Sequence, residues 1–162
     1  MSPKKIAAVG ALTTLCLAFS YVEALLPFNF GIPGVKLGLA NLVILVALRR
    51  LDTKTALLIN LVRIALAGLL FGTIMSLAYS LAGGLLSFLV MWALLRTDRF
   101  SLVGVSLAGG AAHNIGQILV AMVLLSNARL VGYLPVLLLS GVLTGAILGL
   151  AAEAILRCLP KK

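Results

Sequence analysis

Most polar side chains that could do chemistry in this 162-residue chain lie inside apolar runs. Ser106, Gly110, His113 and Gln117 recur at helical spacing within one such run, and Asn114 borders the stripe that they form. The only histidine therefore stands beside two carboxamides, a combination suited to hydrogen bonding with a polar ligand. A lone histidine is also common as a hydrogen-bonded core residue, so both interpretations stay open.

A second polar pair, Asn60 and Arg63, shares one face of another apolar run. Arg63 follows Lys54 by nine residues, or ~13 Å along a helix, so its charge lies deep within the run. A guanidinium keeps its charge and needs an anionic partner. That partner is either Glu23 or a ligand carboxylate or phosphate. Alternatively, Arg63 ties down backbone carbonyls of a broken neighbouring helix.

The segment 31–43 introduces further polar groups where another apolar run begins. Gly34, Gly38 and Asn41 fall on one helical face, with Asn41 about one and a half turns inside the run. Lys36 lies nearer the boundary, where a long side chain can extend its ammonium group into water. Asn41 is therefore predicted to belong to a site, whereas Lys36 fits either role.

These residues define one predicted pocket for a small molecule, with no metal or cofactor. The candidate substrate-binding residues are Glu23, Lys36, Asn41, Asn60, Arg63, His113, Asn114 and Gln117. We predict that the pocket opens outward and is closed by the proline-bracketed loop 27–33. An anionic ligand would supply the partner that Arg63 needs.

The elements that position these residues must be membrane helices. Hydrophobic residues make up 62% of the chain, charged residues 10%, and the mean hydropathy is +1.21. A soluble domain carries roughly 25% charged residues, and the continuous apolar runs exclude a strand pattern. We predict an all-α integral membrane protein, a compact bundle of six transmembrane helices in a single domain, 1–162. The expected spans are 6–26, 35–48, 55–70, 73–95, 102–125 and 131–156.

The basic residues predict the orientation in the membrane. Ten of the 13 Lys and Arg residues fall at the two termini or in the second and fourth connections. Only Lys36 and Arg129 fall on the opposite side, and Arg63 is inside a span. The positive-inside rule then places both termini in the cytoplasm. The net charge of +9 reflects this topology, and no nucleic-acid partner is predicted.

The chain resembles the membrane family labelled heptaprenyl diphosphate synthase component I, also called the Gx transporter family. The resemblance rests on the motifs at 33–41, 62–63 and 110–117 and spans nearly the whole chain. That family is similar to the substrate-binding S components of energy-coupling-factor (ECF) transporters, which are six-helix proteins of the bacterial cytoplasmic (inner) membrane. S components dock onto a transmembrane coupling subunit, which works with ATPases, through an Ala-x-x-x-Ala face of their first helix. Ala7 and Ala11 match that pattern.

The enzyme name of the family conflicts with the acidic residues of this chain. Prenyl-chain elongation needs clustered carboxylates, because these hold the Mg²⁺ ions that bridge a diphosphate. The chain has four acids, Glu23, Asp52, Asp98 and Glu153, and none are paired. We therefore predict that the protein is not an enzyme.

Three functions remain open at the level of sequence. The first is an S-component-like solute-binding subunit for uptake of a compound related to vitamin, isoprenoid or quinone pathways. The second is a stand-alone transporter coupled to protons through His113, Arg63 and Glu23. The third is an accessory membrane subunit of an isoprenoid or quinone enzyme.

Overall fold

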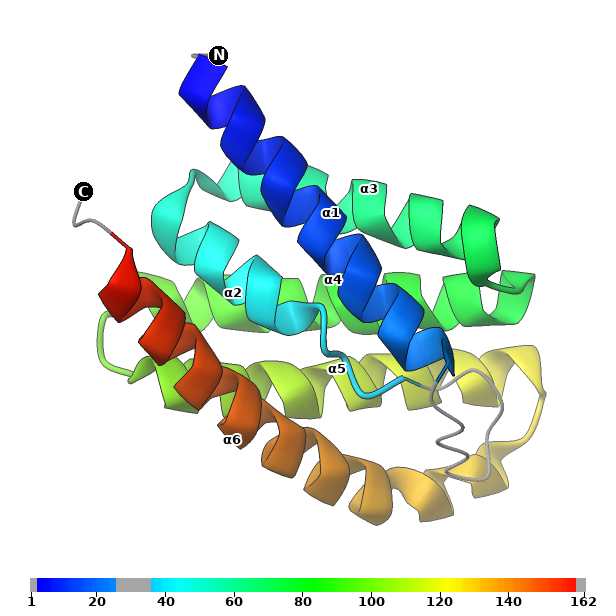
Figure 1. Cartoon of the computed structure of the whole chain (residues 1–162). Helices are drawn as coiled ribbons and strands as arrows, with labels where there is room; N and C mark the ends of the chain where they lie inside the picture. The colour runs from blue at the N-terminus through cyan, green and yellow to red at the C-terminus, as the bar shows by residue number, and fades with distance from the viewer. Residues whose placement is uncertain (1–2, 26–35, 160–162) are drawn as a thin grey trace.

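The computed structural model describes residues 3–25 and 36–159, and that part of the chain is helical throughout apart from its connections. The elements are α1 (Pro3–Leu25), α2 (Asn41–Arg50), α3 (Thr53–Phe71), α4 (Ile74–Arg96), α5 (Leu102–Leu124), the 3-10 helix η1 (Ala128–Tyr133) and α6 (Leu134–Cys158). The helices α3, α4 and α5 run side by side, α6 packs along α5, and α1 passes obliquely across α3 (Figure 1). The predicted all-α fold class, with six α-helices, is confirmed. The loop 27–33 and Gly34 lie outside the described residues.

Five of the helical stretches are long and apolar enough to cross a membrane, and α2 is not among them. These five stretches contain α1, α3, α4, α5 and α6. With 10 residues, α2 rises ~15 Å, about half the thickness of the hydrocarbon core. The expected second span, 35–48, is therefore a half-length helix preceded by the non-helical segment 36–40. The break falls at Gly38, whose φ of +84° lies outside the helical region.

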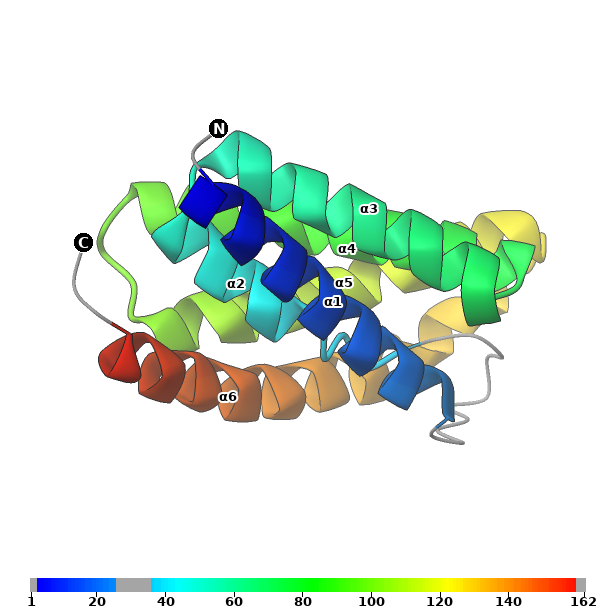
Figure 2. The ribbon, with the colours of Figure 1, turned by 45° about the horizontal axis from the view of Figure 1, so that its top comes forward.

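The short helix α2 is the centre of the bundle. All residues from Asn41 to Ala47 are buried, and α2 packs against each of the five other α-helices. Most of these residues are Leu, Val, Ile and Ala, which suits a helix enclosed by protein on every side. Both views of the ribbon show α2 between α1 and α6 (Figures 1 and 2). Any polar group at its N-terminal end therefore lies in the interior of the bundle.

Capping side chains mark the starts of α3, α4 and α5. The Asp52 carboxylate accepts a hydrogen bond from the Thr55 amide at the start of α3, and the Ser101 side chain caps α5 in the same way. Between α3 and α4, Thr73 and Ser76 form a capping box, in which each side chain bonds the other residue's backbone. These polar caps allow tight connections between apolar helices.

Glycines hold α5 and α6 close together. A Cβ atom at Gly141 would lie 2.7 Å from the Gly110 carbonyl oxygen, and one at Gly145 would lie 2.7 Å from that of Ser106. A Cβ atom at Gly149 would lie at a similar distance from the backbone of α5. These three glycines recur at every fourth residue, so the two helices pack closely along one face of α6.

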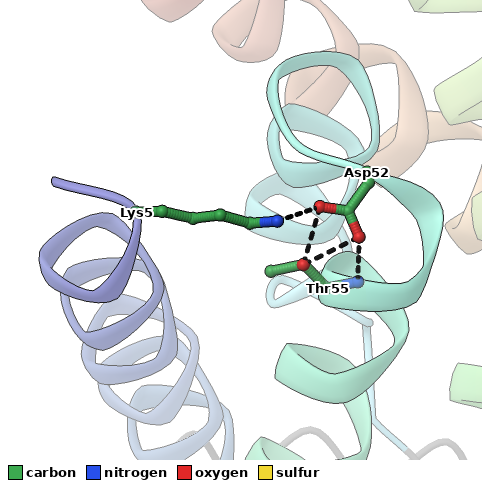
Figure 3. Close-up of polar contacts among 3 residues, drawn as sticks. All are labelled: Lys5, Asp52 and Thr55. Carbon is green, nitrogen blue, oxygen red and sulfur yellow. Dashed lines mark hydrogen bonds and ion pairs between the residues drawn. The ribbon is translucent and has the colours of Figure 1, made fainter. Parts of the chain in front are cut away.

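One end of the bundle collects the basic parts of the chain. The first turns of α1 and the last turns of α6 lie there, together with the α2–α3 and α4–α5 connections (Figure 1, Figure 2). Lys5 of α1 donates to Asp52 at 2.5 Å, as Figure 3 shows, and Arg49 lies 3.9 Å from Asp98. Arg50 donates to two carbonyls at the C-terminal end of α6. Contacts between distant parts of the sequence thus assemble the end that the charge pattern predicts to be cytoplasmic.

The orientation can be tested with single cysteines in a background that lacks the exposed Cys158. A cysteine at Asn127, between α5 and η1, should react with a membrane-impermeant thiol reagent added to intact cells. A cysteine at Thr97, between α4 and α5, should react only after permeabilisation. The reverse pattern would invert the proposed topology.

The contact between Lys5 and Asp52 should depend on pH. The Lys5 ammonium, followed by the Thr55 hydroxyl and amide, holds the pKa of the Asp52 carboxyl below its ordinary value of 3.8 (Figure 3). A carboxyl whose pKa is depressed by folding stabilises the folded state above its ordinary pKa, and this contribution is lost as the pH falls further. Asp52→Asn retains a helix cap and removes the ion pair. We expect a small loss of melting temperature at neutral pH that shrinks below pH 3.8; a loss independent of pH would refute the electrostatic origin.

Candidate functional site

The candidate site surrounds the segment 36–40, which leads into α2 and whose last residue, Ala40, accepts the first helical hydrogen bond, from Ile44 N at 3.2 Å. Two backbone hydrogen bonds of the turn type precede α2, from Asn41 N to Gly38 O at 2.9 Å and from Leu42 N to Leu39 O at 3.2 Å. The remaining backbone groups of this segment need other partners, since an apolar interior offers no water to replace them. Side chains from α1 and α5 supply those partners.

From α1, Glu23 binds the segment through one carboxylate oxygen. Its Oε1 accepts hydrogen bonds from the amides of Gly38, at 2.5 Å, and Leu39, at 3.0 Å. The positive φ of Gly38 turns successive amides toward the same point, a geometry that favours anions. Glu23 also places a negative charge near the N-terminus of α2, where the helix dipole stabilises it.

From α5, Gln117 binds the backbone of Lys36 on two sides. In the carboxamide orientation that satisfies its neighbours, the nitrogen donates to Lys36 O and the oxygen accepts from Lys36 N, each at 3.1 Å. The same oxygen accepts from His113 Nε2 at 3.1 Å. A carboxamide has both the donor and the acceptor that a peptide unit requires. Gln117 thus holds the segment at Lys36, and His113 orients the Gln117 carboxamide.

Gly38 permits this close approach. A Cβ atom there would lie 2.9 Å from Asn41 Nδ2 and 3.2 Å from His113 Cδ2. The first of these separations is one that real Cβ atoms essentially never show, and the φ of +84° is also unfavourable for other residues. The predicted helical face of Gly38 and Asn41 is wrong, because Gly38 precedes α2 in a non-helical conformation; the turn nevertheless brings Gly38 against Asn41 and the His113 ring.

On α3, Arg63 is held by its helical neighbour Asn60. Arg63 Nε and Nη2 donate to Asn60 Oδ1 at 3.1 and 3.0 Å, and Asn60 Nδ2 donates to Gly84 O of α4 at 3.1 Å. Arg63 is 3% exposed, and no carboxylate among the described residues lies within 4.0 Å of its guanidinium. Its charge acts on Glu23 and on Cys16 through space. Arg63 thus has a neutral hydrogen-bond partner and no direct ion pair within residues 3–25 and 36–159.

Asn114 bonds α6, whereas His113 and Gln117 lie on the side of α5 that faces segment 36–40. Its Nδ2 donates to Leu137 O and, at 3.4 Å, to Ser140 Oγ, both on α6. A Cβ atom at Gly141 would lie 2.7 Å from the same nitrogen, so this glycine makes room for the contact. The structure therefore separates Asn114, which joins α5 to α6, from the residues around segment 36–40.

Two buried hydroxyls extend the polar cluster. Ser20 is three residues before Glu23 on α1, and Ser80 is one turn before Gly84 on α4. Neither hydroxyl oxygen has a hydrogen-bond partner among the described residues, and the same is true of Asn41 Nδ2 and His113 Nδ1. The sequence motifs missed Ser20, although its spacing from Glu23 places both on one helical face. Within the described ranges, no group of three His, Cys, Asp or Glu residues is placed to hold a metal ion.

The fold and this cluster define the class: a helical membrane protein that encloses polar side chains around a broken helix. Comparison with protein families then shows a match to heptaprenyl diphosphate synthase component I over residues 12–155. Because the match covers most of the chain, the protein belongs to this family. No curated protein and no solved structure matches the chain.

Replacing Glu23 should destabilise the fold. Glu23→Gln exchanges a charged acceptor for a neutral one and removes a negative charge that acts on Arg63. Hydrogen bonds to charged groups contribute ~1.5–3 kcal/mol, so we expect a clear decrease in the melting temperature of the purified protein in mild detergent.

The matched control is Glu153→Gln, because the Glu153 carboxylate pairs with a largely exposed Arg157 on α6. Changes at such surface pairs are usually within about 0.5 kcal/mol. Equal melting temperatures for the two variants would contradict the role assigned to Glu23.

Proposed function

We propose that this protein is a membrane-embedded solute-binding subunit for small-molecule uptake, of the kind found as S components in ECF transporters. The observation that carries the proposal is the convergence of Glu23 of α1 and Gln117 of α5 on segment 36–40, beside the buried Asn41 of α2 and within reach of the charge of Arg63 of α3. Polar groups are costly in a membrane interior and mark ligand pathways more often than packing sites. A half-length helix that begins at mid-bundle is also a common way to build a substrate site in transporters.

The outer face of α1 supports a docking role. Ala7 and Ala11 are exposed, and a Cβ atom at the neighbouring Gly10 would have nothing within 4 Å. Small residues one turn apart let another helix approach closely. The inner face of the same helix carries Glu23. We therefore propose that α1 contacts a transmembrane coupling subunit on one side and the ligand-binding cluster on the other.

Co-purification from native membranes tests the proposal. Tagged protein should recover a transmembrane coupling subunit and ATPases, and Ala7→Leu combined with Ala11→Leu should abolish that recovery because the larger side chains keep the partner helix away. The matched control is Ala65→Leu with Ala93→Leu, at exposed alanines of α3 and α4, which should leave recovery unchanged. Full recovery with the α1 variant would contradict the docking surface.

The family description favours a second candidate, an accessory membrane subunit of a prenyl diphosphate synthase. Co-purification of a prenyl synthase, in place of ATPases, would support it. Recovery of neither partner, together with uptake that follows a proton gradient, would support the stand-alone transporter. All three functions are compatible with a cytoplasmic location of both termini in a bacterial inner membrane.

A further inference from the structure

Arg63 retains unused hydrogen-bonding capacity in the middle of the polar cluster. A guanidinium has five N–H donors, and the two bonds to Asn60 Oδ1 use two of them. Asn60 is neutral, so these bonds orient the guanidinium without balancing its charge. A buried, permanently charged group without a direct anionic partner is costly, and the cost is removed when a ligand supplies the anion.

Glu23 is engaged elsewhere. Its Oε1 is bound to the amides of Gly38 and Leu39, and it forms no ion pair with Arg63 within 4.0 Å. The charged residues that act on one another in this cluster are Glu23, Lys36 and Arg63. Counted at their formal charges at pH 7, these three residues carry a net charge of +1. One further negative charge would neutralise the cluster.

Arg63 and the His113 ring each approach one of two adjacent glycines of α4. A Cβ atom at Gly84 of α4 would lie 3.1 Å from Arg63 Nη2. A Cβ atom at the adjacent Gly83 would lie 3.0 Å from His113 Cε1. On another edge of the imidazole, a Cβ atom at Gly38 would lie 3.2 Å from His113 Cδ2, and it would lie 2.9 Å from Asn41 Nδ2. Asn41 Nδ2 is a donor without a partner among the described residues. Asn41 Nδ2 of α2 therefore lies near the His113 ring, and Arg63 of α3 lies against the α4 glycine next to the one that approaches that ring.

We propose that Arg63 and Asn41 bind a carboxylate group of the transported molecule. This inference rests on the proposed function and specifies its substrate class. The planar guanidinium suits a carboxylate, which it can bind through two parallel hydrogen bonds. A carboxylate brings the single negative charge that the cluster lacks, whereas a phosphate monoester carries about −1.5 to −2 at neutral pH and would overcompensate it.

The test uses the purified full-length protein in mild detergent, at constant ionic strength. The probes are acetate, hexanoate and benzoate, each compared with its uncharged amide, and inorganic phosphate. We expect at least one carboxylate to raise the melting temperature saturably while its amide does not. Arg63→Gln should weaken that carboxylate about tenfold to a hundredfold, and Arg63→Lys should weaken it less. Arg99→Gln, at an exposed position after α4, is the matched control and should respond like wild type.

A second variant keeps the test decisive if Arg63→Gln fails to fold. Asn41→Asp supplies the missing negative charge covalently, at the first residue of α2, where a helix dipole favours an acid. We expect Asn41→Asp to raise the melting temperature of the protein without added probe and to abolish the response to carboxylates. A lower melting temperature with an unchanged response would overturn the inference.

Other outcomes are equally decisive. Equal responses to a carboxylate and its amide, an Arg63-dependent response to phosphate alone, or no saturable response would each overturn the carboxylate site. These results are independent of partner recovery. If ATPases co-purify but no carboxylate binds, the inference fails and the proposed function stands; if a carboxylate binds but no ATPase is recovered, the site stands and the coupling to an ECF module fails.

Discussion

A polypeptide backbone inside a membrane must satisfy its own hydrogen-bonding groups, and the break before α2 makes that condition hard to meet. A continuous helix would bond these groups internally, but the segment 36–40 has no such helix. Glu23 and Gln117 replace the missing partners with side-chain oxygens and a side-chain amide. One side chain of α1 and one of α5 thus meet this requirement at the same segment.

The same requirement explains why so apolar a chain keeps a group of buried polar residues. Some of them are fully occupied by protein: Asn60 bridges α3 and α4, and Asn114 joins α5 to α6. Others retain unused donors, notably Arg63 and Asn41. A structural explanation covers the first group. The second group is the part of the cluster for which a ligand offers the missing partner, since buried polar atoms are normally hydrogen-bonded.

The long helices could be predicted from the sequence because an apolar run of ~20 residues has few alternatives in a membrane. The half-length of α2 could not, because the apolar run 35–48 looks like a span until the φ of Gly38 and the bonds from Glu23 are known. Helical spacing correctly placed His113 and Gln117 on one face. It did not reveal that Asn114, beside them, bonds α6, since one residue step rotates a side chain by about 100° and the neighbouring helices are unknown at that stage. The assignment of these residues to a ligand stays a prediction.

Hydrogen exchange at the Gly38 and Leu39 amides tests the central claim most directly. In the purified protein these two amides should exchange slowly, because the Glu23 carboxylate accepts both of them in a buried site. Gln117→Leu removes the side chain that holds Lys36 and should accelerate their exchange, while amides in the middle of α4 keep their protection. Rapid exchange of Gly38 and Leu39 in the wild-type protein, or protection that Gln117→Leu leaves unchanged, would contradict the account of a broken helix held by side chains.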